Sequence, residues 1–316
     1  MALQPRWSGT NNDQSVPRAA RAALIACAWA LTCVPAARAQ TPVRVLISAD
    51  MEGLAGAVTG EQLGPAGFEY GRFREFMTAE VLAAIEGARL GGATEFLVAD
   101  AHGNGQNLLI EQLPDDVRVV RSWPRPLGMM EGIDSTFDAA ILLGYHAATT
   151  NPEGVRAHTI SSATLAAVKL NGEPMSEAGI SAAIAGHFGV PVVLITGDDA
   201  AVAEARRMIG DIEGAVVKQA ISFHSATTLT PQAARALIRE RAQAAVARRA
   251  TMTPYVLSAP VTLDLTFKNY RPAEMLAYLP NVARIDAHTV RFVGRDMIEV
   301  SKFIEFAMTY EPALTP

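Results

Sequence analysis

Beyond about residue 42, short continuous apolar runs alternate with longer stretches in which apolar residues recur at helical spacing. Short runs that end at glycine or acidic residues are typical of buried strands, and the longer stretches are typical of helices. The predicted strands are residues 43–49, 94–100, 117–121, 139–145 and 191–196, and the predicted helices are residues 68–90, 176–188 and 200–209. This alternation predicts an α/β fold, a mostly parallel sheet with helices on both faces (an αβα sandwich).

The pattern changes after about residue 222. Apolar and polar residues now alternate in the strand-like segments, as they do in antiparallel strands with one exposed face. The expected elements are a long helix, two strands and a closing helix, at residues 231–250, 256–267, 283–294 and 297–310. We therefore expect a larger α/β domain over residues 43–222 and a smaller α+β lobe over residues 223–316.

The first 39 residues have the features of a cleaved secretory signal peptide. Arg6, Arg18 and Arg21 precede a short apolar stretch at residues 22–34, and Ala37-Arg38-Ala39 provides the small residues of a cleavage site. The apolar stretch is shorter than the ~20 residues that a membrane-spanning helix needs. We predict cleavage after Ala39 and a secreted or periplasmic protein with no stable membrane insertion after the signal is removed.

A lipoprotein signal is the alternative for this segment. The sequence Leu24-Ile25-Ala26-Cys27 resembles a site of cleavage and acylation at the cysteine. Because almost no apolar run precedes Cys27, we favour the ordinary secretory signal.

Removal of the signal changes both the charge and the cysteine content. Without the four arginines and one aspartate of residues 1–39, the chain has 23 basic and 31 acidic residues, a net charge of −8. An acidic protein is poorly suited to bind nucleic acid. Both cysteines, Cys27 and Cys33, belong to the removed segment. The mature protein would therefore hold a metal only through carboxylates and imidazoles.

Two carboxylates follow the first predicted strand, in the sequence Asp50-Met51-Glu52-Gly53. In open α/β sheets, ligands bind outside the carboxyl ends of the strands. A pair of carboxylates at that edge suggests a metal site. Such a site would make the larger domain, residues 43–222, the metal-binding catalytic domain.

Further candidates for metal ligands lie at corresponding places. His102 follows the second strand, His146 follows the fourth, and Glu177 opens a helix. In a parallel sheet, Asp50, Glu52 and the two histidines meet at one edge, which Glu177 can also reach. Taken singly, an aspartate here is typical of a cap or turn, and a histidine here is typical of a hydrogen-bonded structural residue. The metal prediction therefore depends on their combination.

Several short motifs, taken in order, resemble those of the DppA family of D-aminopeptidases, the M55 metallopeptidases. They are Ser48-Ala49-Asp50-Met51-Glu52-Gly53, Asp100-Ala101-His102, Gly144-Tyr145-His146-Ala147, Ala157-His158 and Glu177-Ala178-Gly179. The resemblance extends from about residue 43 to residue 310, and the spacings match as well as the letters.

The resemblance implies a zinc aminopeptidase with two Zn²⁺ ions per chain. Asp50 would bridge the ions, Glu52 and His146 would complete one site, and His102 and Glu177 would complete the other. Carboxylates and imidazoles suit zinc, which needs few ligands and leaves positions open for water.

The resemblance further implies that His158 is the catalytic histidine and that the chain assembles as a homo-oligomer, a decamer whose active sites face an internal channel. The expected substrates are short peptides that lose their N-terminal residue, above all D-alanyl peptides or amides. One departure is Thr159, which follows the histidine where the family pattern has serine.

Some assignments stay open at this point. Asn107 either binds substrate or forms a turn, and Lys218 either meets a substrate carboxylate or pairs with an acidic neighbour. Two alternative functions also stay open. The protein is then either a metal-dependent amidase for another small amide or a non-catalytic periplasmic peptide-binding protein. A serine hydrolase of the α/β class is disfavoured, because the mature chain has no G-x-S-x-G sequence.

Overall fold

The structure is a computed structural model that describes residue 9 and residues 41–310. The chain divides into two units, residues 1–41 and residues 42–316, and only the second is described below. The predicted signal peptide, its cleavage after Ala39 and the alternative acylation at Cys27 lie outside the described residues. Within the described residues, no helix is both long and apolar enough to cross a membrane. The second unit contains two β-sheets, which we call sheet A and sheet B.

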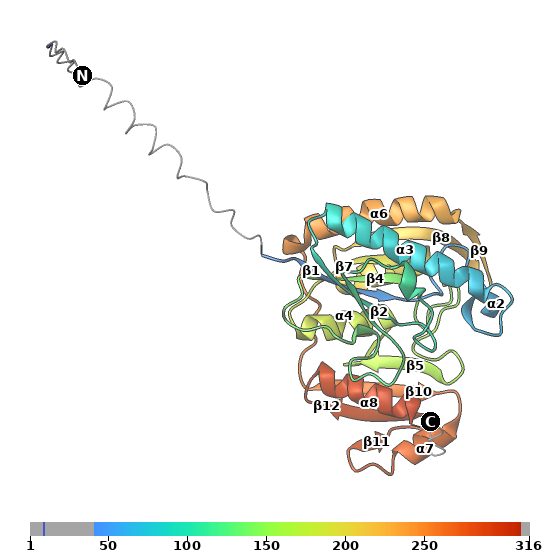
Figure 1. The fold of residues 1–316 in the computed structure, drawn as a ribbon. Helices are drawn as coiled ribbons and strands as arrows, with labels where there is room; N and C mark the ends of the chain where they lie inside the picture. Colours follow the sequence, from blue (N-terminus) through green and yellow to red (C-terminus); the bar gives the residue numbers. More distant parts are fainter. Residues whose placement is uncertain (1–8, 10–40, 311–316) are drawn as a thin grey trace, which may run out of the picture. The chain divides into compact units, whose positions relative to one another are not determined.

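Sheet A has seven strands and lies at the centre of the second unit (Figure 1). In spatial order the strands are β3 (Val117–Val120), β2 (Glu95–Asp100), β1 (Arg44–Ala49), β4 (Ala139–Tyr145), β7 (Val192–Asp198), β8 (Glu213–Ser222) and β9 (Ser225–Thr228). Neighbouring strands are parallel from β3 to β8, and β9 runs antiparallel to β8. The prediction of a mostly parallel sheet is confirmed, and the five strands predicted for the larger domain all belong to it.

Helices cover both faces of sheet A (Figure 1). The long ones are α3 (Tyr70–Leu90) and α6 (Pro231–Ala247) on one face, and α4 (Glu177–His187) and α5 (Asp199–Ile209) on the other. Val45 and Ile47 of β1 belong to the apolar core beneath α3 and α6, whereas Leu46 belongs to the core beneath α4 and α5. Alternate residues of this strand thus face opposite helix layers, as the pleat of a strand requires.

Sheet B is smaller and antiparallel. In spatial order its strands are β11 (Val282–Arg284), β12 (Thr289–Gly294), β10 (Val261–Phe267), β5 (Leu165–Leu170) and β6 (Glu173–Pro174). The remaining helices are α2 (Gly60–Leu63), η1 (Ile110–Gln112), η2 (Gly128–Met130), η3 (Arg249–Thr251), α7 (Tyr270–Leu276) and α8 (Met297–Thr309). Helix α8 packs against β10, β12 and α4, and so joins sheet B to the rest of the unit.

The two sheets do not follow the predicted boundary near residue 222, which falls in the hairpin between β8 and β9. Strands β5 and β6 precede that boundary but belong to sheet B, while α6 follows it but packs on sheet A. The close contact of α6 with α3 depends on Gly87, because a Cβ there would collide with the backbone oxygen of Arg239. Pairing between distant strands leaves no mark in local sequence periodicity. For this reason the sequence did not predict how the strands divide between the two sheets.

Candidate metal centre

The candidate metal ligands gather at the carboxyl edge of sheet A. Asp50 follows β1, His102 follows β2 and His146 follows β4, and β1 lies between the other two strands. In the strand register, Ala49 is opposite Asp100 on one side and Leu143 on the other, so the three strands end at nearly the same height. The prediction that these residues meet at one edge is therefore confirmed by the geometry.

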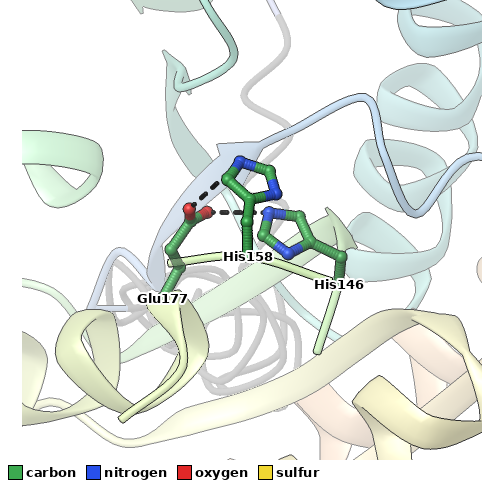
Figure 2. A group of neighbouring side chains, drawn as sticks. All are labelled: His146, His158 and Glu177. Carbon is green, nitrogen blue, oxygen red and sulfur yellow. Dashed lines mark ion pairs between the residues drawn. The ribbon is translucent and has the colours of Figure 1, made fainter. Parts of the chain in front are cut away.

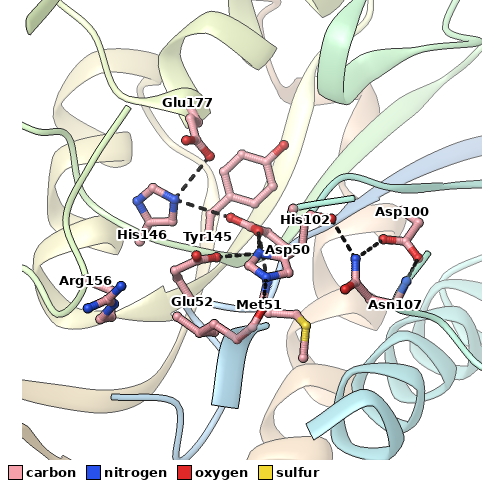
Figure 3. A network of polar contacts seen from close by, with 12 residues as sticks. Asp50, Met51, Glu52, Asp100, His102, Asn107, Tyr145, His146, Arg156 and Glu177 are labelled. Atoms are coloured by element: carbon pink, nitrogen blue, oxygen red, sulfur yellow. Dashed lines mark hydrogen bonds and ion pairs between the residues drawn. The ribbon is translucent and has the colours of Figure 1, made fainter. Parts of the chain in front are cut away.

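Asp50 lies in the middle of the cluster, with one carboxylate oxygen toward each histidine (Figure 3). Its Oδ1 is 3.0 Å from His102 Nδ1, and its Oδ2 is 3.4 Å from His146 Nε2. A carboxylate whose two oxygens face different ligands has the geometry of a bridge between two cations.

A second carboxylate accompanies each histidine. Glu52 Oε2 is 2.8 Å from His102 Nδ1, and Glu177 Oε2 is 3.1 Å from His146 Nε2 (Figure 3). These contacts pair the ligands differently from the family resemblance, which joined Glu52 with His146 and His102 with Glu177. Donor atoms of Asp50, Glu52 and His146 nevertheless lie within 4.8 Å of one another, so the five residues form one cluster.

Backbone carbonyls fix the orientation of both imidazoles. His102 Nε2 lies 2.6 Å from the carbonyl oxygen of Leu63, and His146 Nδ1 lies 3.1 Å from that of Ala147. A carbonyl can only accept, so each of these ring nitrogens carries a proton. In the neutral ring the other nitrogen, Nδ1 of His102 and Nε2 of His146, then directs its lone pair at the carboxylates. Metal-binding histidines are usually held in this way.

The cluster is buried, and several of its polar atoms have no hydrogen bond among the described residues. Each of the five candidate ligand residues is at most 6% exposed: Asp50, Glu52, His102, His146 and Glu177. Asp50 Oδ2, Glu52 Oε2 and His146 Nε2 are the atoms without a hydrogen-bond partner. Buried carboxylates are costly unless they are paired or bind a metal. Carboxylates and imidazoles with converging free lone pairs fit zinc.

The pKa values of the cluster reflect the same crowding of charge. Burial lowers the pKa of His102, but Glu52 and Asp50 raise it well above its usual value; Glu177 and Asp50 do the same for His146. Burial raises the pKa of Glu52 and of Glu177, yet the facing imidazoles bring both below their usual values. Protons thus occupy the places that a cation would take, and metal binding must displace them.

His158 lies next to His146 and Glu177 (Figure 2). Its ring stacks on His146, with 4.0 Å between ring centroids and 7° between planes. Its Nδ1 donates to the carbonyl oxygen of Arg156 over 2.8 Å, and its Nε2 lies 3.7 Å from Glu177 Oε1. The side chain is 15% exposed, which makes it the most accessible imidazole of the site.

The loop that carries His158 has an unusual backbone. Arg156 and Ile160, on either side of the histidine, have φ angles of +55° and +64°, in the region that favours glycine. The backbone N–H of Ile160 donates to Glu177 Oε1 over 2.7 Å. Glu177 in turn begins α4, directly after the helix cap Ser176. The strained loop therefore joins the histidine to the carboxylate, and no sequence signal indicates this contact.

Lys218 stabilises the turn that follows Asp50. The sequence did not indicate this role. This side chain of β8 is buried, and its ammonium donates to the carbonyl oxygens of Glu52, Leu54 (3.1 Å) and Ala57 (2.5 Å). Burial lowers its pKa to about 8. Neither role considered for Lys218 fits these contacts, since it pairs with backbone carbonyls rather than with a substrate carboxylate or an acidic side chain.

Asn107 supports the His102 loop. It is buried, and its Nδ2 donates to Asp100 Oδ1 and to the carbonyl oxygen of His102, over 2.7 and 2.6 Å. Its Oδ1 accepts from the Tyr70 hydroxyl over 2.7 Å. With these partners the side chain has no free group for a substrate, which favours the structural role over substrate binding.

A cavity of about 430 Å³ opens onto the cluster. Its polar lining includes Asp50, Glu52, His102, His158 and Glu177. The apolar part is formed by Trp123, Met129, Ile160, Ile180 and Ile184 together with Ile304 and Met308 of α8. A small molecule with an apolar side chain can therefore lie beside the candidate ligands.

Comparison with known proteins identifies a family. A model of the M55 peptidases, described as D-aminopeptidase, matches residues 43–306, which include every strand of both sheets. A D-aminopeptidase of Bacillus subtilis (strain 168) is 33% identical over 258 residues, which are 81% of this chain and 93% of the relative.

A solved structure is similar over nearly the same region. It is described as the Zn-dependent D-aminopeptidase DppA from Bacillus subtilis, a self-compartmentalizing protease. It matches with a TM-score of 0.80 and 31% sequence identity, covering 85% of this chain and 99% of its own. The similarity therefore concerns the whole fold and not a single motif.

Proposed function

The chain belongs to the M55 peptidase family, the D-aminopeptidases, and we propose that it is a binuclear zinc aminopeptidase that removes the N-terminal residue from short peptides, chiefly D-alanyl peptides or amides. The observation that carries the proposal is the convergence of lone pairs at Asp50. Two imidazoles, each oriented by a backbone carbonyl, face the oxygens of one aspartate and of two further carboxylates in a buried site.

The ligand assignment is the one that the family resemblance implies. Asp50 would bridge two zinc ions, with Glu52 and His146 on one and His102 and Glu177 on the other. It is supported by the donor atoms of Asp50, Glu52 and His146, which lie within 4.8 Å of one another. When bound, zinc supplies a Lewis acid that polarises a carbonyl and lowers the pKa of a water ligand. The free amino terminus of a substrate would bind one of the ions, which restricts attack to the first peptide bond.

His158 is proposed as the catalytic histidine. Because its Nδ1–H is held by the Arg156 carbonyl, Nε2 is the nitrogen available to the reaction. A protonated Nε2 can donate to the developing oxyanion or to the leaving amine, and a neutral one can accept a proton. Stacking on His146 keeps the ring beside the cluster, so that this nitrogen stays close to the bond that breaks.

The cavity supports the substrate class. Its apolar wall, from α4 and α8, accepts a small side chain, while its polar end holds the candidate ligands. The preference for the D configuration is inferred from the relatives, which are described as D-aminopeptidases.

Assembly and location complete the proposal. The solved relative is described as self-compartmentalizing, and we propose that this chain also forms a homo-oligomer, a decamer as the family resemblance implies. The pattern of residues 1–39 supports export, so the enzyme would act in the periplasm or outside the cell. Measuring the mass of the mature protein in solution and its N-terminal sequence after export tests both parts.

A zinc titration tests the catalytic proposal. Metal-free protein is titrated with zinc while free D-alanine released from D-Ala-D-Ala is measured. We expect release to appear only as the second equivalent binds. Full activity at one equivalent would reject the binuclear centre, and two bound equivalents without release would favour a different amide substrate or a binding role.

A further inference from the structure

A second cavity adjoins the metal centre on the far side of His158. It measures about 320 Å³ and shares two lining residues, His158 and Ser162, with the cavity that contains the candidate ligands. Its other walls are formed by Thr149, Asn151, Pro152, Gly154, Ala157, Phe223 and Lys268. The candidate catalytic histidine therefore stands between two chambers.

Among the described residues that line either cavity, Lys268 is the only lysine or arginine. Its Nζ donates to the carbonyl oxygen of Ser162 over 2.5 Å, and its backbone N–H donates to that of Thr164 over 2.8 Å. Since Ser162 lines both cavities, this bond places the ammonium at their junction. An ammonium has three donors, and within the described residues only one of them has an acceptor.

The charges of the two cavities differ. The metal-centre cavity is lined by the carboxylates of Asp50, Glu52, Glu177 and Glu305 and by no lysine or arginine. A short peptide with free termini carries one positive and one negative end. The ligand carboxylates are neutralised once zinc is bound. What distinguishes the second cavity for the negative end is therefore Lys268, whose ammonium has donors left for a carboxylate.

We propose that the second cavity is the subsite for the leaving residue and that Lys268 Nζ binds its free α-carboxylate. The proposal rests on the proposed function, and it narrows the substrate class to short peptides with a free C-terminus. In a peptide bound in this way, His158 lies beside the peptide chain, between its N-terminus and its C-terminus. Its scissile amine then lies beside the imidazole, as the role of a proton donor requires.

A purely structural role for Lys268 makes a different prediction. If the side chain only ties the loop of Ser162 and Thr164 in place, its loss would weaken every ligand alike. If it binds the carboxylate, its loss would weaken only ligands that carry one.

Matched ligands separate these two roles. The probes are reduced-bond analogues of D-Ala-D-Ala, whose CH₂–NH link cannot be hydrolysed, prepared as the free acid and as the C-terminal amide. Their dissociation constants are measured by calorimetry with zinc-loaded wild-type protein and with Lys268→Met, Lys268→Arg and Lys169→Met. Lys169 is an exposed lysine on β5 that lines neither cavity and serves as the control.

We expect the wild-type protein to bind the free acid about tenfold or more tightly than the amide, as one charge-assisted hydrogen bond allows. Lys268→Met should lose this preference and leave amide binding unchanged, whereas the other two variants should keep it. No preference in the wild type, or an equal loss for both ligands in Lys268→Met, would overturn the proposal. Turnover of D-Ala-D-Ala is measured separately: its absence with the preference intact would reject the proposed hydrolysis and not the subsite.

Discussion

The rings of His146 and His158 stack face to face, 4.0 Å apart, yet only His146 directs a nitrogen toward Asp50. This difference supports the proposed ligand role of His146 and the proposed catalytic role of His158. The geometry also brings His158 within reach of the cluster, since donor atoms of both histidines and of Glu177 lie within 4.8 Å of one another. The distinction between the roles is therefore open to direct measurement.

The first prediction concerns His158→Ala. We expect the variant to keep both zinc ions while kcat falls by roughly 10²–10⁴-fold, the usual contribution of a general acid or base. Zinc content is measured by elemental analysis and kcat with D-Ala-D-Ala, with the exposed His187→Ala as the control. Near-normal turnover would remove the catalytic role, and loss of zinc would make His158 a ligand.

The second prediction compares two ligand variants. If Asp50 bridges, Asp50→Ala should weaken both zinc sites, whereas His102→Ala should weaken only the site assigned to His102 and Glu177. After dialysis, we expect about one zinc per chain in His102→Ala and well under one in Asp50→Ala. Equal zinc contents in the two variants would contradict a bridging aspartate.

The third prediction concerns the support of the turn by Lys218. In Lys218→Met the carbonyls of Glu52, Leu54 and Ala57 lose their donor, and each buried hydrogen bond left unmade costs about 1–3 kcal/mol. The free energy of unfolding should fall by about 3 kcal/mol or more, and the variant should bind zinc more weakly because Glu52 is displaced. Denaturant unfolding and a zinc titration measure these effects.

The exposed Lys169→Met is the matched control for that experiment, since it removes the same charge without touching the turn. A Lys218→Met protein with the stability and zinc affinity of the wild type would show that the turn does not need the ammonium.

The fourth prediction concerns the pH dependence of stability. Glu80 of α3 is buried, accepts from the backbone N–H of Ala55, and has its pKa raised by burial from an ordinary 4.5 to about 7. Between these values the folded chain holds a proton that the unfolded chain has lost. Stability from this group is therefore complete below about pH 4.5 and is lost as the pH rises through about 7, on the order of 3 kcal/mol in total.

A Glu80→Gln variant removes this ionisation. Relative to the wild type, it should be more stable at pH 8 and nearly equal at pH 5, which denaturant unfolding at the two pH values measures. A stability difference that does not change with pH would mean that Glu80 does not titrate in this range.

The sequence predicted the mostly parallel sheet and the meeting of the candidate ligands at its edge. Asp50, His102 and His146 were predicted to meet because each follows a strand of a parallel sheet, and strand ends are visible in local apolar runs. The expectation that no thiolate binds the metal depends on the predicted cleavage after Ala39, since both cysteines precede residue 40.

The remainder depends on contacts between distant parts of the chain. Lys218 meets the turn at Glu52 from a separate strand, and β5 joins sheet B through pairing with β10, almost a hundred residues later. Arg156 and Ile160 have positive φ angles, but neither is a glycine, so the sequence did not indicate these backbone conformations. The pairing of ligands at Asp50 likewise depends on side-chain directions that local patterns do not determine.

The most direct test of the central claim is the release of free alanine from D-Ala-D-Ala and from L-Ala-L-Ala by the mature protein, with and without a chelator. The account predicts release from the D-dipeptide, abolished by the chelator and restored by zinc, with little release from the L-dipeptide. Release only from the L-dipeptide, or release that the chelator does not affect, would contradict a zinc-dependent D-aminopeptidase.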